Sequence, residues 1–499
     1  MKHTGLNRRQ FLNRSLAAGI GASFAIGGTK SSGRVIGANE TIRVAIAGLN
    51  GRGGSHVNSC TKIDGVEIAY LVDPDSRVYK KRLDQIKDSG RKVVPKTIKD
   101  IRLALDDKDV DVVSIATPNH WHSLMTIWGC QAGKDVYVEK PCSHNIHEGR
   151  VAVEAARKYN RIVQHGTQSR SDKDWALTAE IIRSGKLGKL LVSRALCYKN
   201  RKSIGVKPNA EPPAELDYNL WLGPAIDRPY NGNYVHYNWH WFWSFGNGDI
   251  GNQGVHQMDI ARWMIPESSS PGGSATYPKS VLSLGGRFGY EDQGETPNTQ
   301  ISVMDFGQTQ LIFEVRGLPS KLFLGEGIGN IAHLEAGAII GGKKFIPKGK
   351  AEADAIPLEK LGIKAEADVV RGPGDNHYEN FIAAVRSRKV EDLNSDILDG
   401  HYSSALCHLA NISYRLGRPV PFDQKTKAFG DDKEAYEAIA RMEEHLGKEH
   451  SLKLDGLSYN LGQKLTFDAA TESFVDSPDA NKLLTRPYRA PFVVPDKLA

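Results

Sequence analysis

Short apolar runs and amphipathic stretches alternate through the first third of the chain. The run at 42–46 has no helical periodicity, so it predicts a strand that is buried on both faces. A glycine-rich turn follows at 48–54, and a second apolar run at 66–72 ends at Asp73. This pattern predicts strand, turn, helix and strand between residues 41 and 73.

The turn at 48–54 has the composition of a nucleotide-binding loop. Its glycines are spaced G-x-x-G-x-G rather than G-x-G-x-x-G. Backbone without Cβ atoms can approach a pyrophosphate, which then lies at the N-terminus of the next helix. Asp73 lies where such sites place the ribose-binding acid, and a carboxylate there repels the 2′-phosphate of NADP. NAD is therefore favoured, although Arg77 leaves NADP open, and a purely structural turn is the alternative.

The alternation of strands and helices continues to about Gln168. Strands are expected at 110–116, 135–141 and 161–168, with a helix from Ile146 to Tyr159 before the last of them. Strands joined by helices of this length form a parallel sheet, and its functional loops lie at the C-terminal ends of the strands.

The pattern changes after Gln168. Longer stretches rich in Thr, Val, Phe and Tyr predict an antiparallel sheet, at 190–198, 281–289, 299–306 and 309–316. Two later stretches, 376–388 and 401–416, read as helices that return to the first domain.

The predicted fold class is α/β: an N-terminal Rossmann-type parallel-sheet domain and a C-terminal α+β domain with an open, mostly antiparallel sheet. A chain of 499 residues with 40% hydrophobic content can bury two such cores. The expected divisions are a signal region, a nucleotide-binding domain, a sheet domain, returning helices and a C-terminal extension, at 1–38, 39–168, 169–375, 376–420 and 421–499.

The net charge of +7 is concentrated at the N-terminus. Residues 1–38 contain six basic side chains and no acidic ones, so the remainder carries +1. A nearly neutral main body gives no electrostatic reason to expect a nucleic-acid partner.

The N-terminal segment has the features of an export signal. Residues 7–12 read Asn-Arg-Arg-Gln-Phe-Leu and resemble a twin-arginine motif, a mild apolar stretch follows at 16–28, and 36–38 is a candidate cleavage site. A retained membrane anchor is the alternative, but the stretch is short and rich in glycine for a span. We therefore expect the twin-arginine translocase to export the protein to the periplasm or an equivalent extracytoplasmic space.

The cysteines indicate neither a zinc site nor a disulfide framework. There are five, at positions 60, 130, 142, 197 and 407, with no C-x-x-C spacing. Free buried thiols are expected, which suits a protein that folds in the cytoplasm before export.

The sequence Val138-Glu139-Lys140-Pro141 carries the most specific resemblance to a known family. With the glycine loop, the stretch 116–122 and His256-Gln257-Met258-Asp259, it resembles the Gfo/Idh/MocA oxidoreductases (glucose–fructose oxidoreductase, inositol dehydrogenase, rhizopine catabolism). The resemblance covers nearly all of residues 41–420. It implies that the substrate lies between an open-faced sheet and the nicotinamide. The segment 216–224 resembles the exported branches of the family.

The resemblance also implies a set of cofactor contacts. They comprise the glycine loop, the ribose acid and the ends of later strands: Gly48, Asn50, Gly51, Arg52, Gly53, Asp73, Thr117, Asn119, His122, Glu139, Lys140 and Gln168. We expect a tightly bound NAD molecule, with NADP as the less favoured cofactor, and a homo-oligomeric protein.

Four residues are the candidates for the chemistry. A carbon that gives up a hydride must also lose its hydroxyl proton, so His256 is the candidate base and Lys140 the group that polarises the hydroxyl. If the stretch is helical, His256 shares a face with Asp259 and Asn252. The family usually has an aspartate where this chain has Asn252, so Asp249 or Asp259 could take part in the relay instead. A core histidine and a structural ion pair are the alternatives.

An aromatic run between 234 and 245 is the candidate substrate surface. If it is extended, Tyr237 and tryptophans 239, 241 and 243 share one face, while His236, Asn238 and His240 share the other. Aromatic faces stack on sugar C–H groups, and imidazoles bond hydroxyls. We therefore expect substrate contacts at His236, Trp239, His240 and Trp243. A purely structural run is the alternative, and no metal site is expected.

The residues and the resemblance together predict an exported NAD-dependent oxidoreductase that acts on a carbohydrate hydroxyl. Because the extracytoplasmic space supplies no general NAD pool, the cofactor is expected to be regenerated in place. A second sugar could re-oxidise it, or a transient C3 ketone could promote elimination of a glycosidic bond before the hydride returns. A non-catalytic sugar-binding protein is a further alternative.

Overall fold

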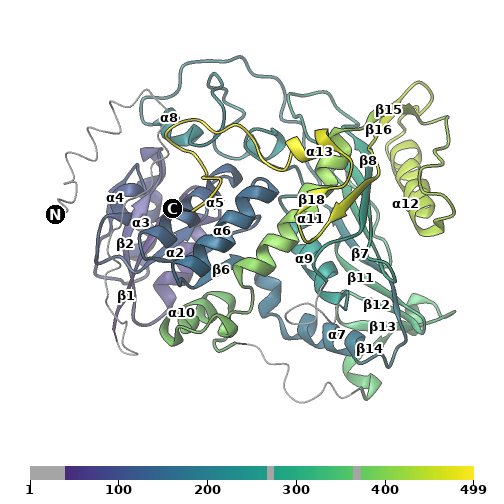
Figure 1. Ribbon diagram of the computed structural model, residues 1–499, viewed down its shortest axis with the longest axis horizontal. Coiled ribbons are helices and arrows are strands. Elements are labelled where there is room, and N and C mark those ends of the chain that lie inside the picture. Colours follow the sequence, from purple (N-terminus) through teal and green to yellow (C-terminus); the bar gives the residue numbers. More distant parts are fainter. Residues whose placement is uncertain (1–39, 267–274, 364–371, 499) are drawn as a thin grey trace.

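The computed structural model describes residues 40–266, 275–363 and 372–498. Figure 1 shows the first sheet with its helices on the left and the second sheet on the right. The predicted signal region, 1–38, lies outside the described residues, so the export prediction stays a prediction.

The first domain is built on six parallel strands in the order β3-β2-β1-β4-β5-β6. The strands are β1 Ile42–Ala47, β2 Val66–Val72, β3 Lys96–Ile98, β4 Val112–Ile115, β5 Asp135–Glu139 and β6 Val163–Gly166. The helices between them are α2 Gly53–Lys62, α3 Tyr79–Asp88, α4 Arg102–Leu105, α5 Asn119–Gln131 and α6 Ile146–Lys158. The strand order reverses between β1 and β4, where dinucleotides bind in such folds.

Strand β1 is buried on both faces because its side chains alternate between two cores. Ile42, Val44 and Ile46 pack with α2, α3 and the returning helix α10 (His377–Ser387). Ala45 and Ala47 pack on the opposite side with α5 and α6. The apolar run without helical periodicity is thus explained by helices on both faces of the sheet.

The second sheet has the strand order β14-β13-β12-β11-β7-β10-β9-β8-β16-β15, and the short strands β17 and β18 extend it beside β8. Its pairs are antiparallel except β7 with β10, which confirms the predicted mostly antiparallel sheet. The strands are β7 Leu190–Tyr198, β8 Ser280–Gly286, β9 Thr299–Asp305, β10 Gln310–Arg316, β11 Ile328–Leu334, β12 Gly337–Ile340, β13 Lys344–Pro347, β14 Ile356–Pro357, β15 Arg418–Pro421, β16 Ser458–Leu461, β17 Leu465–Asp468 and β18 Ser473–Phe474.

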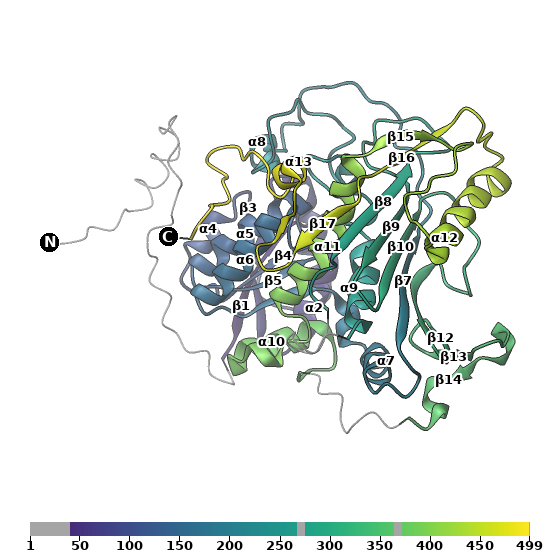
Figure 2. The same ribbon diagram turned by 45° about the vertical axis from the view of Figure 1, so that its right-hand side comes forward.

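Helices cover both faces of this second sheet. On the inner face α7 (Lys173–Arg183), α9 (Gly254–Met264) and α11 (Ile397–Arg415) share one core with β7 and β10. On the outer face α12 (Lys433–Glu444), from the C-terminal extension, packs against β7, β9 and β10. Figure 2 shows α12 beside the strands, so the sheet is less open than expected.

The C-terminal arm, 483–498, follows the short helix α13 (Pro478–Lys482) and returns to the first domain (Figure 1). The Phe492 ring lies 5.4 Å from the Trp121 ring. Arg489 Nε donates to the Gly223 carbonyl at 3.1 Å, beside helix α8 (Tyr218–Leu222). The arm therefore ties the segment around α8 to the nucleotide-binding domain.

The five cysteines are buried free thiols, as predicted. Among the described residues, no helix is both long and apolar enough to span a membrane.

Candidate active site

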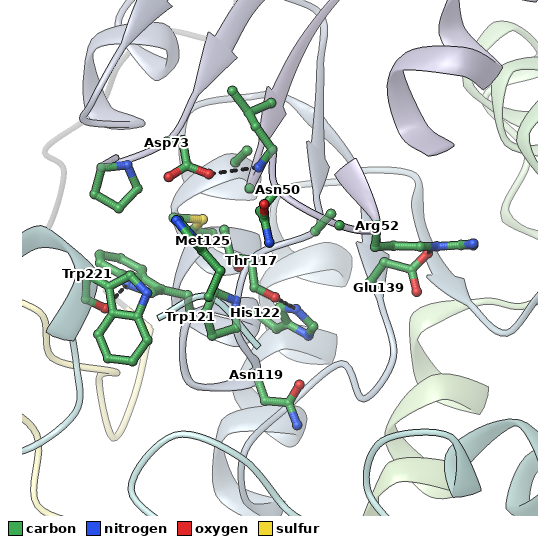
Figure 3. A pocket seen from close by; sticks show the side chains of 18 of the residues that line it. Asn50, Arg52, Asp73, Thr117, Asn119, Trp121, His122, Met125, Glu139 and Trp221 are labelled. Atoms are coloured by element: carbon green, nitrogen blue, oxygen red, sulfur yellow. Dashed lines mark hydrogen bonds and ion pairs between the residues drawn. The ribbon is translucent and has the colours of Figure 1, made fainter. Parts of the chain in front are cut away.

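A cavity of about 240 Å³ lies at the C-terminal edge of the first sheet. It is lined by the loops after β1, β2, β4 and β5 and by parts of 220–252 from the second domain. Figure 3 shows the side chains around it. Of the expected cofactor contacts, Gly53 and Gln168 do not line the cavity; the others do, namely Gly48, Asn50, Gly51, Arg52, Asp73, Thr117, Asn119, His122, Glu139 and Lys140.

Two glycines allow the turn to pack against its neighbours. Gly48 has φ of +84°, and a Cβ there would lie 2.5 Å from the Ala116 carbonyl carbon. A Cβ on Gly53 would lie 1.9 Å from the Gly48 carbonyl oxygen. Gly53 therefore lets the backbone pack closely against the Gly48 carbonyl, on the side of the turn away from the cavity lining where its cofactor contact was predicted.

Asp73 provides the carboxylate at the nucleoside end of the cavity. Its Oδ2 accepts from Leu49 N at 2.8 Å (Figure 3), and its Oδ1 accepts from Asp75 N at 3.0 Å. Burial raises the pKa of Asp73 to about 6, against the opposing effect of these two bonds. The bonds orient the carboxylate, and each oxygen retains a lone pair for a ribose hydroxyl.

A second acid, Asp75, binds the guanidinium of Arg77. Arg77 Nε donates to both carboxylate oxygens, at 2.8 and 3.1 Å, and Arg77 Nη2 also contacts Oδ2. His236 Nε2 lies 2.9 Å from the same Oδ2. The predicted substrate contact His236 thus lies at the nucleoside end, where it joins the second domain to the first. This correction follows from a contact across 161 residues.

Glu139 is buried within a charged network behind the cavity. Its Oε1 accepts from Arg52 Nε at 2.7 Å (Figure 3) and from Gln168 Nε2 at 3.1 Å, and lies 3.2 Å from His56 Nε2. Burial raises the pKa of Glu139, but the hydrogen bond with His56 and the Arg52 charge outweigh it and hold this pKa well below its usual range. Gln168 therefore acts behind Glu139 rather than at the cavity wall, which corrects its predicted cofactor contact.

Lys140 lies at the other end of the cavity, directly after β5. Its Nζ donates to the Asn252 carbonyl at 3.0 Å and to Asn252 Oδ1 at 3.1 Å. Burial lowers the pKa of Lys140 to about 8, although the Glu139 carboxylate opposes this shift. The amide of Asn252 thus orients the amine without adding the negative charge of an aspartate.

The other candidate catalytic residues differ from the prediction in their surroundings. Asn252 precedes helix α9, so it does not share a helical face with His256. His256 lies on the first turn of α9 and does not line the cavity; burial, then the Lys140 charge, lowers its pKa to about 3.

Asp259 accepts from Arg170 at 2.8 Å, and Asp249 accepts from Arg201 at 2.6 Å. Both acids are in buried ion pairs, which argues against a relay through either.

The aromatic run is not extended, because 238–241 form a 3₁₀ helix. Trp239 and His240 line the cavity, stack with ring centroids 3.6 Å apart and lie beside Tyr237. Trp243 does not line it; this side chain lines a second cavity and packs against Arg415. The structure therefore places Trp243 away from the main cavity where its substrate contact was predicted, because tight turns break the alternation of the run.

The residues around the cavity fit a dinucleotide. Thr117 Oγ1 is buried and has no hydrogen-bond partner among the described residues, although Thr117 lines the cavity. The bare Gly48–Gly51 backbone and the carboxylate of Asp73 complete sites for a pyrophosphate and a ribose.

Sequence reasoning missed several lining residues. Trp121, Met125 and Trp221 line the cavity, and Trp121 Nε1 donates to the Trp221 carbonyl at 3.1 Å (Figure 3). Trp121 lies within the stretch 116–122 that carried the resemblance, so its position was a usable signal. Trp221 lies within the segment 216–224, which also carried a resemblance, but nothing in that segment indicated a role at the cavity.

Comparisons with known proteins agree with this geometry. Residues 42–167 match the profile of the oxidoreductase family with an NAD-binding Rossmann fold. Residues 180–272 and 362–446 match the C-terminal alpha/beta domain of the same family. The first domain is therefore an NAD-binding domain, and the comparisons do not distinguish NADP.

Individual relatives match the chain at low identity and over less than half of its length. A glycosyl hydrolase family 109 protein of Shewanella pealeana is 29% identical over 213 residues, covering 38% of this chain and 45% of the relative. The levoglucosan dehydrogenase of Pseudarthrobacter phenanthrenivorans is 27% identical over 218 residues, covering 43% and 49%. The chain thus spans about half the length of these curated relatives.

A solved structure supports the fold. The WlbA dehydrogenase of Bordetella pertussis, in complex with NADH and UDP-GlcNAcA, has a TM-score of 0.52 and 17% identity, covering 75% of this chain and 97% of that one. The two family profiles together match more than half of the chain, which shows that it belongs to the Gfo/Idh/MocA oxidoreductase family.

Proposed function

We propose that the protein oxidises a hydroxyl group of a sugar or glycoside with a tightly bound NAD molecule. The observation that carries the proposal is the position of Lys140. Its amine lies in the same cavity as the glycine turn and Asp73, with a pKa of about 8. Bound NAD⁺ supplies a hydride acceptor, so the chain must supply the group that takes the hydroxyl proton.

Lys140 is a better proton acceptor than His256. An effective general base has a pKa near the working pH, and the Lys140 value of about 8 meets this condition. The His256 value of about 3 makes its imidazole neutral and weakly basic. In our proposal the neutral Lys140 amine receives the hydroxyl proton and becomes an ammonium, while the Asn252 oxygens hold it in place. His256 is a buried neighbour whose own pKa is lowered by burial and by the Lys140 charge.

Aromatic side chains form part of the cavity wall that also contains Lys140. Tyr237 is half exposed, and it adjoins Trp239 and His240 on the cavity wall. Aromatic rings suit the apolar faces of a sugar ring. One of the relatives is a levoglucosan dehydrogenase, whose name denotes a sugar substrate.

The acids at the nucleoside end favour NAD over NADP. An arginine near the ribose site accommodates a 2′-phosphate in NADP enzymes. Here Asp75 binds Arg77 through both carboxylate oxygens, and the Asp75 side chain is fully buried. A 2′-phosphate would therefore have to compete with Asp75 for Arg77 and approach the Asp73 carboxylate.

A second candidate function is redox-neutral cleavage of a glycoside. It is favoured by the 29% identity to a glycosyl hydrolase family 109 protein. In this cycle, a ketone formed at C3 acidifies the C2 proton, which is lost as the glycosidic bond breaks and the aglycone leaves as its alcohol. Water then adds across the C1–C2 double bond, with its hydroxyl on C1 and a proton on C2, and the hydride returns to C3. The same Lys140 amine would serve the first and last steps.

We also propose export by the twin-arginine route with the cofactor already bound. The basis is the N-terminal motif at 7–12 and the need for NAD outside the cytoplasm. The C-terminal arm supports retention of the cofactor, since Arg489 and Phe492 hold the segment around α8 against the NAD-binding domain. The homo-oligomer stays a prediction.

The experiment is a panel of sugars and glycosides added to the purified full-length protein. Oxidation produces the absorbance of reduced nicotinamide and an oxidised sugar. Redox-neutral cleavage instead releases free sugar without net reduction, and in D₂O it introduces deuterium at C2. If nucleotide-loaded protein changes no member of the panel in either way, the non-catalytic sugar-binding alternative gains and the proposal fails.

A further inference from the structure

A second cavity, of about 250 Å³, holds the tryptophan that the main site does not use. It lies where four segments meet: the loop after β5, the turn containing Trp243, helix α11 and the C-terminal arm. We call it the Trp243 cavity. Its volume is close to the 240 Å³ of the cofactor cavity, so it can admit a small molecule.

The Trp243 cavity has an excess of positive charge. Arg415, Lys482 and Arg486 line it, and none of the described lining residues carries a carboxylate. Lys482 pairs with Asp479 at 2.8 Å, and Arg486 pairs with Glu148 at 3.1 Å.

Arg415 stacks on Trp243 rather than pairing with an acid. Its guanidinium carbon lies 5.2 Å from the Trp243 ring centroid. Within the described ranges, no carboxylate oxygen lies within ion-pair distance, 4.0 Å, of this guanidinium. Burial lowers the pKa of Arg415, and the Glu295 carboxylate, which is paired with Arg228, opposes this shift from beyond that distance. Stacking fixes the plane of the guanidinium and leaves its N–H groups for an anion.

Neutral polar groups form the floor of the cavity. His144 is 9% exposed, and its Nε2 has no hydrogen-bond partner among the described residues. Burial holds the pKa of His144 well below its usual range and lowers that of His408 to about 3. These uncharged imidazoles can exchange hydrogen bonds with hydroxyl groups without adding charge. An unpartnered buried nitrogen is costly unless a ligand satisfies it.

We propose that the Trp243 cavity binds a small anionic carbohydrate, a sugar ring with one carboxylate or sulfate group. The anionic group pairs with Arg415, the ring packs beside Trp243, and a hydroxyl reaches His144. The chemistry common to both ligand types is a single negative charge on a polyhydroxylated ring. This binding does not depend on the proposed oxidation.

The two cavities are joined through one side chain. Asn247 Oδ1 accepts from Asn119 Nδ2 at 3.1 Å, and Asn119 lines the cofactor cavity. Asn247 Nδ2 donates to the His144 carbonyl at 3.0 Å, and both residues line the Trp243 cavity. The proposed ligand therefore binds next to the amide that orients Asn119.

Isothermal titration of the full-length, nucleotide-loaded protein tests the proposal. The probes are glucuronate, a glucose sulfate and neutral glucose. We expect glucuronate or the sulfate to bind at least about tenfold more tightly than glucose, because the charge pair with Arg415 adds to the hydrogen bonds. Tighter binding of one anion identifies the charged group. Equal binding of glucose, or no binding of either anion, overturns the proposal.

Two variants locate the binding. Arg415→Gln should weaken the anionic sugar at least about tenfold and leave glucose unchanged, and Trp243→Leu should weaken all three probes. The matched control is Arg418→Gln, since Arg418 is exposed on β15 and does not line the cavity. Thermal unfolding and nucleotide content verify that each variant is folded. Anion binding that survives in Arg415→Gln, or falls equally in Arg418→Gln, contradicts the assignment.

Discussion

The two ends of the cofactor cavity differ in the partners that their cationic side chains contact. At the nucleoside end, Asp75 holds Arg77, and Arg102 Nη2 donates to Asp100 at 2.6 Å. At the other end, Lys140 contacts the neutral oxygens of Asn252. The first end pairs both of these arginines with acids, whereas the second leaves a buried amine beside an amide.

This difference separates binding from chemistry. Paired charges keep a fixed protonation state and hold the loops in place, so they suit recognition of a cofactor. A buried amine without a carboxylate in contact has its pKa lowered toward the working pH, to about 8 for Lys140. The comparison predicts that substitutions at one end change cofactor binding and that those at the other change the rate.

The largest effect is expected at Lys140. Lys140→Met should reduce turnover by about 10²–10⁴-fold, because it removes the proton acceptor. Lys140→Arg should be nearly as slow, since an arginine keeps the charge but does not give up its proton. Both should retain the nucleotide, measured by mass spectrometry of the denatured protein. Wild-type turnover in either variant would show that the lysine is structural.

Asp75→Asn should change cofactor preference. Loss of the carboxylate frees Arg77 for a 2′-phosphate, so the ratio of the NADP and NAD dissociation constants should shift toward NADP by about tenfold, or about 1.4 kcal/mol. The constants are measured on protein stripped of nucleotide. Asp84→Asn is the control, because Asp84 pairs with Lys80 on an exposed helix face. An unchanged ratio would mean that Arg77 does not reach the ribose.

The histidine and the lysine are distinguished by the pH profile. Activity should rise with pH through a value of about 8, because the deprotonated Lys140 amine is the acceptor. His256→Ala should keep this ionisation, whereas Lys140→Met should lose it in its residual activity. Turnover is measured at saturating substrate with a deuterated carbon centre to verify that hydride transfer limits the rate. Loss of the ionisation in His256→Ala would make the histidine the base.

The smallest effect is expected from Asn252→Asp, which restores the family's usual acid. A carboxylate about 3 Å from Nζ favours the ammonium, so the Lys140 pKa should rise by about one unit or more. The rising limb of the pH profile should move to higher pH, with nucleotide affinity unchanged. A shift to lower pH would contradict the assignment of that limb to Lys140.

The sequence was sufficient for the features that are local in the chain. Strand β7 begins and ends at the predicted residues, and the glycine turn and Lys140 lie at strand ends in the expected domain. These follow from side-chain period and from a short motif, which need no knowledge of distant partners.

The features that failed depend on contacts between distant segments. Asp259 pairs with Arg170, 89 residues away, and His236 contacts Asp75 across 161 residues. Alternation suggested an extended aromatic run, but the 3₁₀ turn at 238–241 rotates Trp243 into another cavity. The spacing of residues within the run cannot predict which distant segments they contact.

The most direct test of the proposed oxidation follows the hydride itself. The nucleotide-loaded protein is mixed with a sugar deuterated at the hydroxyl carbons, and the released nicotinamide is analysed by mass spectrometry. The account predicts deuterium on the nicotinamide ring after one turnover, and transfer that is about 10²–10⁴-fold slower with Lys140→Met. A substrate that is converted without any deuterium reaching the bound nucleotide would contradict it.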